Sequence, residues 1–255
     1  MKPLHILNAL LFPPSCASCG EILPYYTEEP FCTACRGKWE AEKRRCCPGC
    51  HKPLSECRCP IPGSEALPCI SLVFYDPDAK TGESPAKEML LSVKEGRQRR
   101  TEDFLAGQLA GQLSPRFPNR TDTVMTYVPR KRVKVRVTGT DQARVIAEKT
   151  AELLGIPICP VLVRGAGKAA DQKELNASER EKNASGAYML SSNAAFRDMC
   201  CGKHMILVDD IITSGATVHA CASLLIEAGA ASVTAASVAR TLRQKHVPPQ
   251  DTKDV

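Results

Sequence analysis

Two adjacent carboxylates, Asp209 and Asp210, come directly after a run of four apolar residues, 205–208. We expect a buried strand at this run and a turn that opens with the carboxylates. A hydroxyl-rich stretch follows at residues 213–217, and a helix-like pattern begins near Val218. Backbone N–H groups at the start of a helix favour an anion, above all a phosphate monoester. The carboxylates cannot hold that phosphate because like charges repel, but they suit sugar hydroxyls or a divalent cation. The sequence therefore predicts a site for a ribose 5-phosphate.

A second chemistry is carried by cysteines, nine of the fourteen lying between residues 16 and 59. Two-residue gaps let both thiolates of a pair reach one metal ion, and two such pairs about a dozen residues apart complete a tetrahedral zinc site. Zinc binding is worth about 10–16 kcal/mol in small finger peptides, and this short segment has few large apolar residues to bury. We therefore predict one or two structural zinc ions. The expected ligands are Cys16, Cys19, Cys32, Cys35, Cys47, Cys50, Cys57 and Cys59.

The pairing of these ligands stays open. Cys57 and Cys59 are only one residue apart, so Cys46 or His51 can replace a ligand in the second set. A cross-braced arrangement, in which pairs alternate between two metals, also fits. The competing interpretation is a disulfide framework in a secreted protein. Residues 1–11 have a short apolar patch but no small-residue cleavage site, so we expect an amphipathic helix there and a cytoplasmic protein.

Behind the cysteines, strands and helices are expected to alternate. Residues 60–68 have the composition of a linker. Alternation implies an α/β fold with a doubly wound, mainly parallel sheet, whose ligands lie at the carboxyl ends of the strands. Nothing approaches the roughly 18–20 continuous apolar residues of a membrane span. We expect strands at residues 70–75, 124–128, 158–163, 205–208 and 232–238, and helices at 103–113 and 141–154, the second capped by Asp141 and ended by Gly155.

The net charge of +6 is modest, but the cations are clustered. Such clusters attract phosphate-rich partners, either a pyrophosphate or a nucleic-acid backbone, although many are only solvated faces. A long polar stretch at residues 164–183 is typical of a functional lid or of a disordered excursion. The first cluster contains Lys94, Arg97, Arg99 and Arg100, and the second contains Arg130, Lys131, Arg132, Lys134 and Arg136.

The run 205–217 resembles the phosphoribosyl-pyrophosphate (PRPP) signature of the type I phosphoribosyltransferases. Over nearly the whole chain, the serial cysteine pairs, the basic loop and the residues from Arg164 to Asn183 resemble the ComF family. One departure is the run 136–142, Arg-Val-Thr-Gly-Thr-Asp-Gln, which replaces that family's usual Arg-Gly-x-Asn-Gln. The resemblance implies that Asp209 and Asp210 contact ribose hydroxyls, that Thr213, Ser214, Gly215, Ala216 and Thr217 wrap the 5-phosphate, and that Arg130, Lys131 and Arg132 face the pyrophosphate.

The resemblance also implies a type I phosphoribosyltransferase-like domain at residues 63–243, a cysteine-rich zinc-ribbon or zinc-knuckle domain at 1–62 and a polar tail at 244–255. We expect a protein that binds PRPP or a related phosphosugar with Mg²⁺. It would assist DNA uptake or the processing of single-stranded DNA, in contact with the DNA or a partner helicase. Trp39, Tyr25 and Tyr26 are the few candidates for base stacking. The alternatives are an active phosphoribosyltransferase, with Asp209 and Asp210 as the catalytic pair, and a PRPP-sensing regulator.

Overall fold

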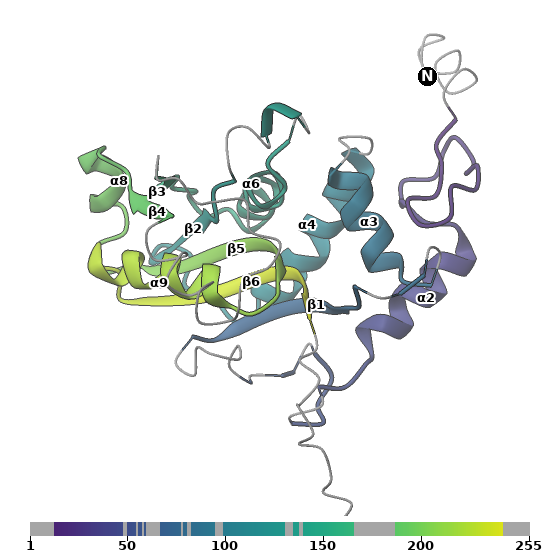
Figure 1. Cartoon of the computed structure of the whole chain (residues 1–255), viewed down its shortest axis with the longest axis horizontal. Helices are drawn as coiled ribbons and strands as arrows, with labels where there is room; N and C mark the ends of the chain where they lie inside the picture. Colours follow the sequence, from purple (N-terminus) through teal and green to yellow (C-terminus); the bar gives the residue numbers. More distant parts are fainter. Residues whose placement is uncertain are drawn as a thin grey trace, which may run out of the picture.

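The computed structural model shows an α/β chain with a central sheet and helices on both of its faces (Figure 1). The structure describes residues 13–47, 50–54, 56–57, 59, 67–77, 79–80, 83–94, 99–130, 135–137, 140–165 and 187–241. The amphipathic helix expected at residues 1–11, most of the linker at 60–68 and the tail at 244–255 lie outside these residues.

The central sheet has four strands in the order β1-β6-β5-β2, and every neighbouring pair is parallel. The strands are β1 (Cys69–Tyr75), β2 (Thr123–Tyr127), β5 (His204–Ile212) and β6 (Ser232–Thr241). Parallel strands place all their carboxyl ends at one edge of the sheet, where ligands of such folds bind. The prediction of a mainly parallel sheet is therefore confirmed.

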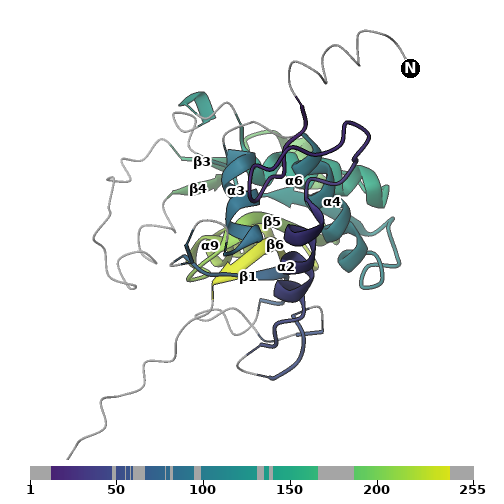
Figure 2. The same cartoon turned by 90° about the vertical axis from the view of Figure 1, so that its right-hand side faces the viewer.

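Helices lie on both faces of the sheet (Figures 1 and 2), and each face contributes to its own core, as a doubly wound arrangement requires. One core contains apolar side chains of α3 (Pro85–Lys94), α4 (Arg99–Leu113) and α6 (Gln142–Leu154). The other contains those of α9 (Ala216–Glu227), together with Leu162 and Tyr188. Strand β5 serves both, because alternate side chains of a strand point to opposite faces: Ile206 and Val208 join the first core, and Met205 and Leu207 the second.

Helix α6 begins and ends where the sequence predicts. The side chain of Asp141 accepts a hydrogen bond from the backbone N–H of Arg144, which satisfies one of the free donors of the first turn. Gly155 follows the helix in the left-handed conformation, with φ of 64°, a conformation that glycine adopts without strain.

The largest differences from the predicted strand bounds occur at residues 158–163 and 205–208. In the first, Ile158 makes only an isolated parallel bridge with Met125, formed by hydrogen bonds from the N–H of Met125 to the Pro157 carbonyl and from the N–H of Cys159 to the Met125 carbonyl. The following strand, β3 (Leu162–Arg164), pairs antiparallel with β4 (Tyr188–Leu190) in a separate two-stranded sheet, which is followed by α8 (Ala194–Asp198). Strand β5 continues through both aspartates to Ile212, so the turn expected at Asp209 comes later.

The cysteine-rich segment packs directly on the α/β body through α2 (Thr33–Lys43), an element that the sequence patterns did not indicate. Trp39 of α2 is fully buried, and its ring lies 5.6 Å from that of Phe104 on α4. Phe31 completes the aromatic group, 5.8 Å from Trp39 and 5.4 Å from Phe104. The boundary at residues 62 and 63 stays a prediction. Among the described helices, none is both long and apolar enough to cross a membrane.

Candidate functional site

A cavity of about 190 Å³ opens at the carboxyl edge of the sheet. Residues from the segment after β2, from α6, β5, the β3–β4 pair and α9 line it, so it draws together segments that are far apart in the sequence. Four of the predicted site residues share this cavity: Arg130, Asp209, Asp210 and Thr217. The full lining is Val128, Pro129, Arg130, Asp141, Gln142, Ala143, Arg164, Tyr188, Asp209, Asp210 and Thr217.

The two carboxylates occupy the end of β5 and are only partly accessible. The side chain of Asp209 accepts a hydrogen bond from the N–H of Asp210 at 2.9 Å, and that of Asp210 from the N–H of Ile211 at 2.7 Å. Loss of hydration, followed by the nearby charge of Asp210, raises the pKa of Asp209 well above its usual range. A hydrogen-bond donor that stabilises the ionised carboxylate, such as a sugar hydroxyl, is therefore favourable here.

The loop at residues 213–217 encloses a smaller hollow of about 30 Å³ next to Asp209. Gly215 directly precedes α9 with φ of 79°, a left-handed conformation that few other residues adopt easily. The N-cap offers no side-chain acceptor to α9, and the hydroxyl of Ser214 reaches the N–H of Ala216 only at 3.5 Å. The first turn of this helix thus presents N–H groups and a positive dipole end to an anion.

Asp141 joins the two ends of the basic loop. Its Oδ2 accepts a hydrogen bond from the N–H of Arg130 at 3.1 Å, while the same carboxylate caps α6. The guanidinium of Arg130 donates to the carbonyl of Thr140 at 3.4 Å. Asp141 holds both backbone N–H groups because each of its two carboxylate oxygens accepts one hydrogen bond, whereas the amide of the ComF pattern has a single acceptor oxygen. Burial raises the pKa of Asp141.

We expect Asp141→Ala to lower the free energy of unfolding by about 1–2 kcal/mol, because it removes a helix cap and the clamp on Arg130. Asp141→Asn is the matched comparison: it has one acceptor oxygen where the carboxylate uses two, so it can keep only one of the two hydrogen bonds, and we expect an intermediate loss. Urea denaturation followed by circular dichroism measures both. Equal losses in the two variants would mean that the hydrogen bond retained by asparagine contributes nothing measurable to stability.

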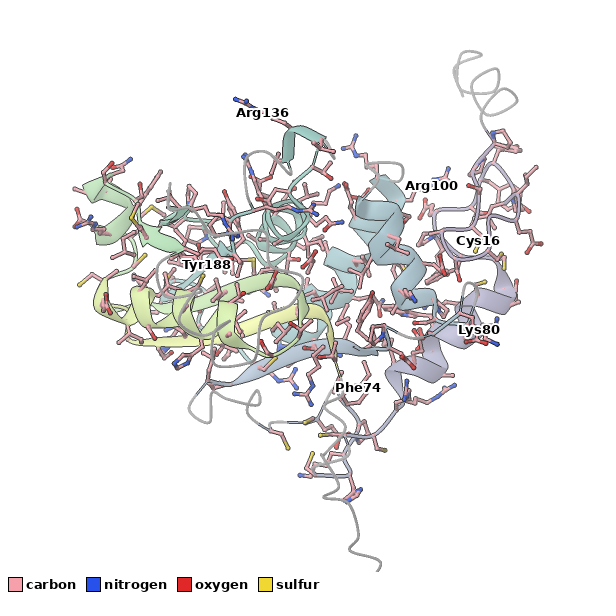
Figure 3. All side chains as sticks on the ribbon, in the orientation of Figure 1. Cys16, Phe74, Lys80, Arg100, Arg136 and Tyr188 are labelled. Carbon is pink, nitrogen blue, oxygen red and sulfur yellow. The ribbon has the colours of Figure 1, made fainter. Side chains whose placement is uncertain are left out.

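Two residues of the cavity were missed as site residues by sequence reasoning. Arg164 and Tyr188 face each other across the β3–β4 pair, and the guanidinium donates to the Tyr188 hydroxyl at 3.0 Å. The guanidinium carbon also lies 4.9 Å from the centre of the tyrosine ring. Burial raises the pKa of Tyr188 to about 12, so its hydroxyl keeps its proton. Arg164 had a signal, since it follows an expected strand, whereas a single tyrosine had none. Tyr188 is labelled in Figure 3.

Several predicted residues lie outside the described part of the chain. These are Lys131, Arg132 and Lys134 of the basic loop, and the polar stretch at residues 166–186 that includes Gln172, Arg180 and Asn183. Arg136 is described and exposed, and Figure 3 shows it pointing away from the body. Of the first basic cluster, Arg99 is exposed and Arg100 is half-buried. Their roles toward a ligand stay predictions.

The eight paired cysteines form two separate groups of four. Within each group the sulfur atoms all lie within 4.8 Å of one another. A tetrahedral zinc ion with Zn–S bonds of about 2.3 Å has sulfur–sulfur edges of about 3.8 Å. The Sγ atoms of Cys19 and Cys32 are 3.8 Å apart, so the geometry fits zinc and each group can hold one ion. The groups are Cys16, Cys19, Cys32 and Cys35, and Cys47, Cys50, Cys57 and Cys59.

This grouping follows the order of the pairs along the chain, so the described residues do not have the cross-braced arrangement. Neither Cys46 nor His51 belongs to a group, and both are exposed. Crowding of the sulfurs changes their chemistry. Burial by itself raises the pKa of Cys16, but hydrogen bonds from backbone N–H groups outweigh this effect and lower the pKa to about 7. The Cys50 side chain, then burial, raises the pKa of Cys59 to about 12. A dication removes this conflict between neighbouring sulfurs.

Arg240 is a third residue that the motif analysis did not assign to a site. It comes near the end of β6 and is almost fully buried, and its Nη2 lies 3.0 Å from the Sγ of Cys57 and 3.6 Å from that of Cys47. Its guanidinium carbon also lies 5.4 Å from the centre of the Phe74 ring. A cation beside paired cysteines suits thiolates bound to a metal. The sequence placed Arg240 after the last strand, but nothing in it indicated a contact nearly two hundred residues away.

The sequence profile of the phosphoribosyl transferase domain matches residues 108–255, more than half of the chain. The chain belongs to this family. The match includes the carboxylates of β5, the loop at residues 213–217 and α9, which together form the cavity edge described above. The α/β fold and the parallel sheet agree with it, so the expected type I phosphoribosyltransferase-like fold is confirmed, with a cysteine-rich segment at its front.

Curated relatives share only part of the sequence. A DNA utilization protein YhgH of Salmonella typhi is 32% identical over 104 residues, which are 41% of this chain and 43% of that protein. The protein of the same name from Escherichia coli K12 is 38% identical over 73 residues, 29% of this chain and 30% of the relative. The chain therefore spans less than half the length of these curated relatives. The match confirms the resemblance to the ComF family.

Solved structures of similar shape are distant in sequence. A crystal structure of an adenine phosphoribosyltransferase has 19% identity and a TM-score of 0.41, covering 62% of this chain and 89% of that one. The adenine phosphoribosyltransferase of Saccharomyces cerevisiae has 20% identity and a TM-score of 0.37, covering 57% and 72%. The fold assignment depends on the family match and the sheet topology.

Proposed function

We propose that this protein binds PRPP or a related phosphorylated ribose, with Mg²⁺, at the carboxyl edge of its sheet, and that binding serves the handling of DNA. The observation that carries the proposal is the placement of Asp209 between two hollows. One hollow contains the loop before α9 and suits the 5-phosphate, and the other contains Arg130 and Arg164. A carboxylate between two places for phosphates suits the hydroxyls of the ribose that joins them.

Charge supports PRPP over an uncharged sugar. The 190 Å³ cavity is lined by two arginines, Arg130 and Arg164, and by three carboxylates. The cations suit a pyrophosphate, and the carboxylates suit hydroxyl donors and a magnesium ion that accompanies the pyrophosphate. Tyr188 adds a hydroxyl that stays neutral at physiological pH. Lys131 and Arg132 would add further positive charge to the same loop.

Isothermal titration of the full-length protein with PRPP and Mg²⁺ tests the proposal. We expect saturable binding, weaker binding of ribose 5-phosphate, which lacks the pyrophosphate, and no binding of ribose. The order reflects the number of charge-assisted hydrogen bonds that each compound can make. Equal affinity for ribose and PRPP would show that the hollow at residues 213–217 does not hold a phosphate.

A transfer reaction is the second candidate, and the family match favours it. Attack of a nitrogen base on the ribose passes through an oxocarbenium-like state as pyrophosphate leaves, so cations near the pyrophosphate and exclusion of water assist it. Arg130 and Arg164, which line the cavity, would stabilise the departing charge. Pyrophosphate release from PRPP in the presence of purines and pyrimidines separates an enzyme from a binding protein.

Contact with single-stranded DNA is the part of the proposal that the names of the curated relatives support. The structure changes the candidates for base stacking, because Trp39 is fully buried whereas Tyr25 and Tyr26 are exposed. Their rings meet edge to face, 5.5 Å apart, on the rim of a hollow of about 510 Å³ that also contains Arg100. Figure 3 shows Arg100 on the side of the molecule that faces the Cys16 loop.

The charges around this hollow are mostly compensated. Glu29 pairs with Arg36 at 2.7 Å, and Asp103 pairs with Lys149. The Nη1 of Arg100 is buried without a hydrogen-bond partner. A nucleotide in this hollow could stack its base on a tyrosine ring, and its phosphate could accept a hydrogen bond from an accessible N–H of the Arg100 guanidinium.

We expect Tyr25→Ala combined with Tyr26→Ala to weaken binding of a single-stranded oligonucleotide about 10- to 100-fold, because stacking is worth about 1–3 kcal/mol per base. Fluorescence anisotropy at low salt measures this. Replacing both tyrosines by phenylalanine is the control and should retain affinity, since the stacking faces remain. A double alanine variant with wild-type affinity would place the DNA contact elsewhere.

We further propose that both cysteine groups bind zinc in the cell. Their sulfur geometry fits the ion, and all eight side chains are free thiols in the structure. Thiolate sites of this kind persist in a reducing compartment, which favours the cytoplasm.

A further inference from the structure

The second cysteine group lies against the carboxyl ends of β1 and β6. Cys47, Leu54 and Cys57 form a small core with Phe74, the next-to-last residue of β1. Phe74 is paired in register with Arg240 of β6. Figure 3 shows Phe74 at the lower end of the sheet, beside sulfur atoms of this segment. The group therefore contacts the same edge of the sheet as the loop at residues 213–217, here called the phosphate loop.

Charge connects this group to Arg240. Four thiolates around one Zn²⁺ carry a formal charge of −2, and the nearly buried guanidinium donates toward two of these sulfurs. Such outer hydrogen bonds orient metal ligands and strengthen metal binding. The dependence is mutual, because a buried guanidinium that loses its negative partners is strongly destabilising. If zinc is lost, the negative charge of the metal-bound thiolates would no longer balance the buried guanidinium of Arg240.

The residue after Arg240 contacts the phosphate loop. The hydroxyl of Thr241 donates to the carbonyl of Thr213 at 3.3 Å, and Arg240 itself is paired in register with Ile212. Movement of the Arg240 side chain out of its buried place displaces the last residues of β6. The loop at residues 213–217 then loses a support on its first residue.

We propose that Arg240 is a positioning residue that makes phosphosugar affinity depend on metal occupancy of the second cysteine group. This inference rests on the proposed function of the site at residues 209–217. Zinc in the group holds Arg240, Arg240 holds the end of β6, and Thr241 holds the loop in its binding conformation. A loop that must be ordered on binding gives weaker affinity than one that is already ordered.

The first cysteine group offers an internal comparison. Three of its cysteines, Cys16, Cys32 and Cys35, belong to the core of Phe31 and Trp39, and the exposed Cys19 has a carboxylate, Glu21, 4.0 Å from its sulfur. Cys19 and Cys59 are matched positions, because each is one of four ligands and neither is buried. Loss of one ligand from either group should release zinc, but only the second group contacts β6 through Arg240.

The test measures zinc per chain by mass spectrometry and the Kd for PRPP with Mg²⁺ by titration calorimetry, on full-length variants. Arg240→Gln is expected to release zinc to a chelator about 10-fold faster and to bind PRPP about 10-fold more weakly. Cys59→Ser should lose one zinc ion with a similar loss of affinity. Cys19→Ser should lose one zinc ion and keep its Kd within about 2-fold.

Thr241→Val separates the effect of zinc on Arg240 from the contact between β6 and the phosphate loop. It should retain zinc as the wild type does and still bind PRPP more weakly, since it removes only the contact with Thr213. The proposal is overturned if Cys59→Ser binds PRPP as the wild type does, or if Cys19→Ser loses as much affinity as Cys59→Ser. The comparison of Cys59→Ser with Cys19→Ser tests the proposal even if Arg240→Gln does not fold. A wild type that fails to bind PRPP refutes the proposed function itself, whereas these variant outcomes refute only the link.

Discussion

Asp209→Asn combined with Asp210→Asn is expected to weaken PRPP binding about 100-fold or more. Each carboxylate can accept a hydrogen bond from a ribose hydroxyl, and a hydrogen bond to a charged group is worth about 1.5–3 kcal/mol. Two of them amount to about 3–6 kcal/mol, and about 1.4 kcal/mol corresponds to a 10-fold change. Calorimetric titration of the double variant and of each single variant measures the loss.

The two single variants should differ. The raised pKa of Asp209 means that this side chain already tends toward the neutral acid, which asparagine imitates in size and charge. We therefore expect Asp210→Asn to weaken PRPP binding more than Asp209→Asn. Asp198→Asn, a change in α8 away from the cavity, is the control and should leave the Kd unchanged. A double variant that retains wild-type affinity would contradict the assignment of the ribose site to β5.

Asp209→Asn should stabilise the protein in the absence of ligand. The folded-state pKa of Asp209 is above its unfolded value of about 3.9, so the folded chain holds its proton more tightly. Stability from this proton is complete below pH about 4 and is lost as the pH rises through the folded-state pKa. Asparagine does not titrate, so its contribution to stability does not fall as the pH rises. Asp209→Asn should therefore gain stability relative to the wild type from pH about 4 upward, which urea denaturation at several pH values measures.

Removal of zinc is expected to have the largest effect on the fold. The first cysteine group encloses the start of α2, since Cys32 is its N-cap and Cys35 lies in its first turn. Trp39 follows one turn later, buried against Phe31 and Phe104. Without a metal, four crowded sulfurs no longer hold the loop onto the helix. The part of the front that contains the first cysteine group and α2 should then separate from α4 and expose the tryptophan.

Trp39 is the only tryptophan of the chain, so its fluorescence reports on this event directly. We expect chelation to shift the emission to longer wavelength and to lower the melting temperature, and added zinc to reverse both. Zinc contributes about 10–16 kcal/mol to the folding of small finger peptides, and part of that contribution should appear here.

Matched cysteine variants locate the effect. Cys32→Ser should reproduce the emission shift, whereas Cys46→Ser and Cys201→Ser, which change exposed cysteines outside both groups, should not. A chain that is shown to be free of zinc and yet has unchanged Trp39 emission would mean that apolar packing alone holds the front in place.

Local patterns determined much of the fold. Apolar runs predicted the positions of all four strands of the main sheet, because strands buried on both faces are nearly continuously apolar. Asp141 and Gly155 predicted the two ends of α6, because capping depends on residues next to the helix end. Two-residue spacing likewise indicated the cysteine pairs, since both ligands of a pair come from one short turn.

Strand ends were less predictable. The strand expected at residues 158–163 was reduced to one bridge at Ile158 and the short β3, while β5 continued through two aspartates, a residue type that is unfavourable in strands. The ladder with β6 holds this part of β5 in place, since Ile211 and Ile212 pair with Ala239 and Arg240. Such pairing depends on residues far along the chain, so a local pattern cannot show it.

By itself the sequence determined the chemistry of the candidate site: a carboxylate pair, a hydroxyl-rich loop before a helix, and eight cysteines at ligand spacing. Only the tertiary structure decided which of these meet. It brought Tyr188 and Arg164 to the wall of the cavity, grouped the cysteines into two separate sets, and placed Arg240 against Cys57. The physical reason is that residue types and short spacings act over one turn, whereas contacts between distant segments form only when a common core buries them together.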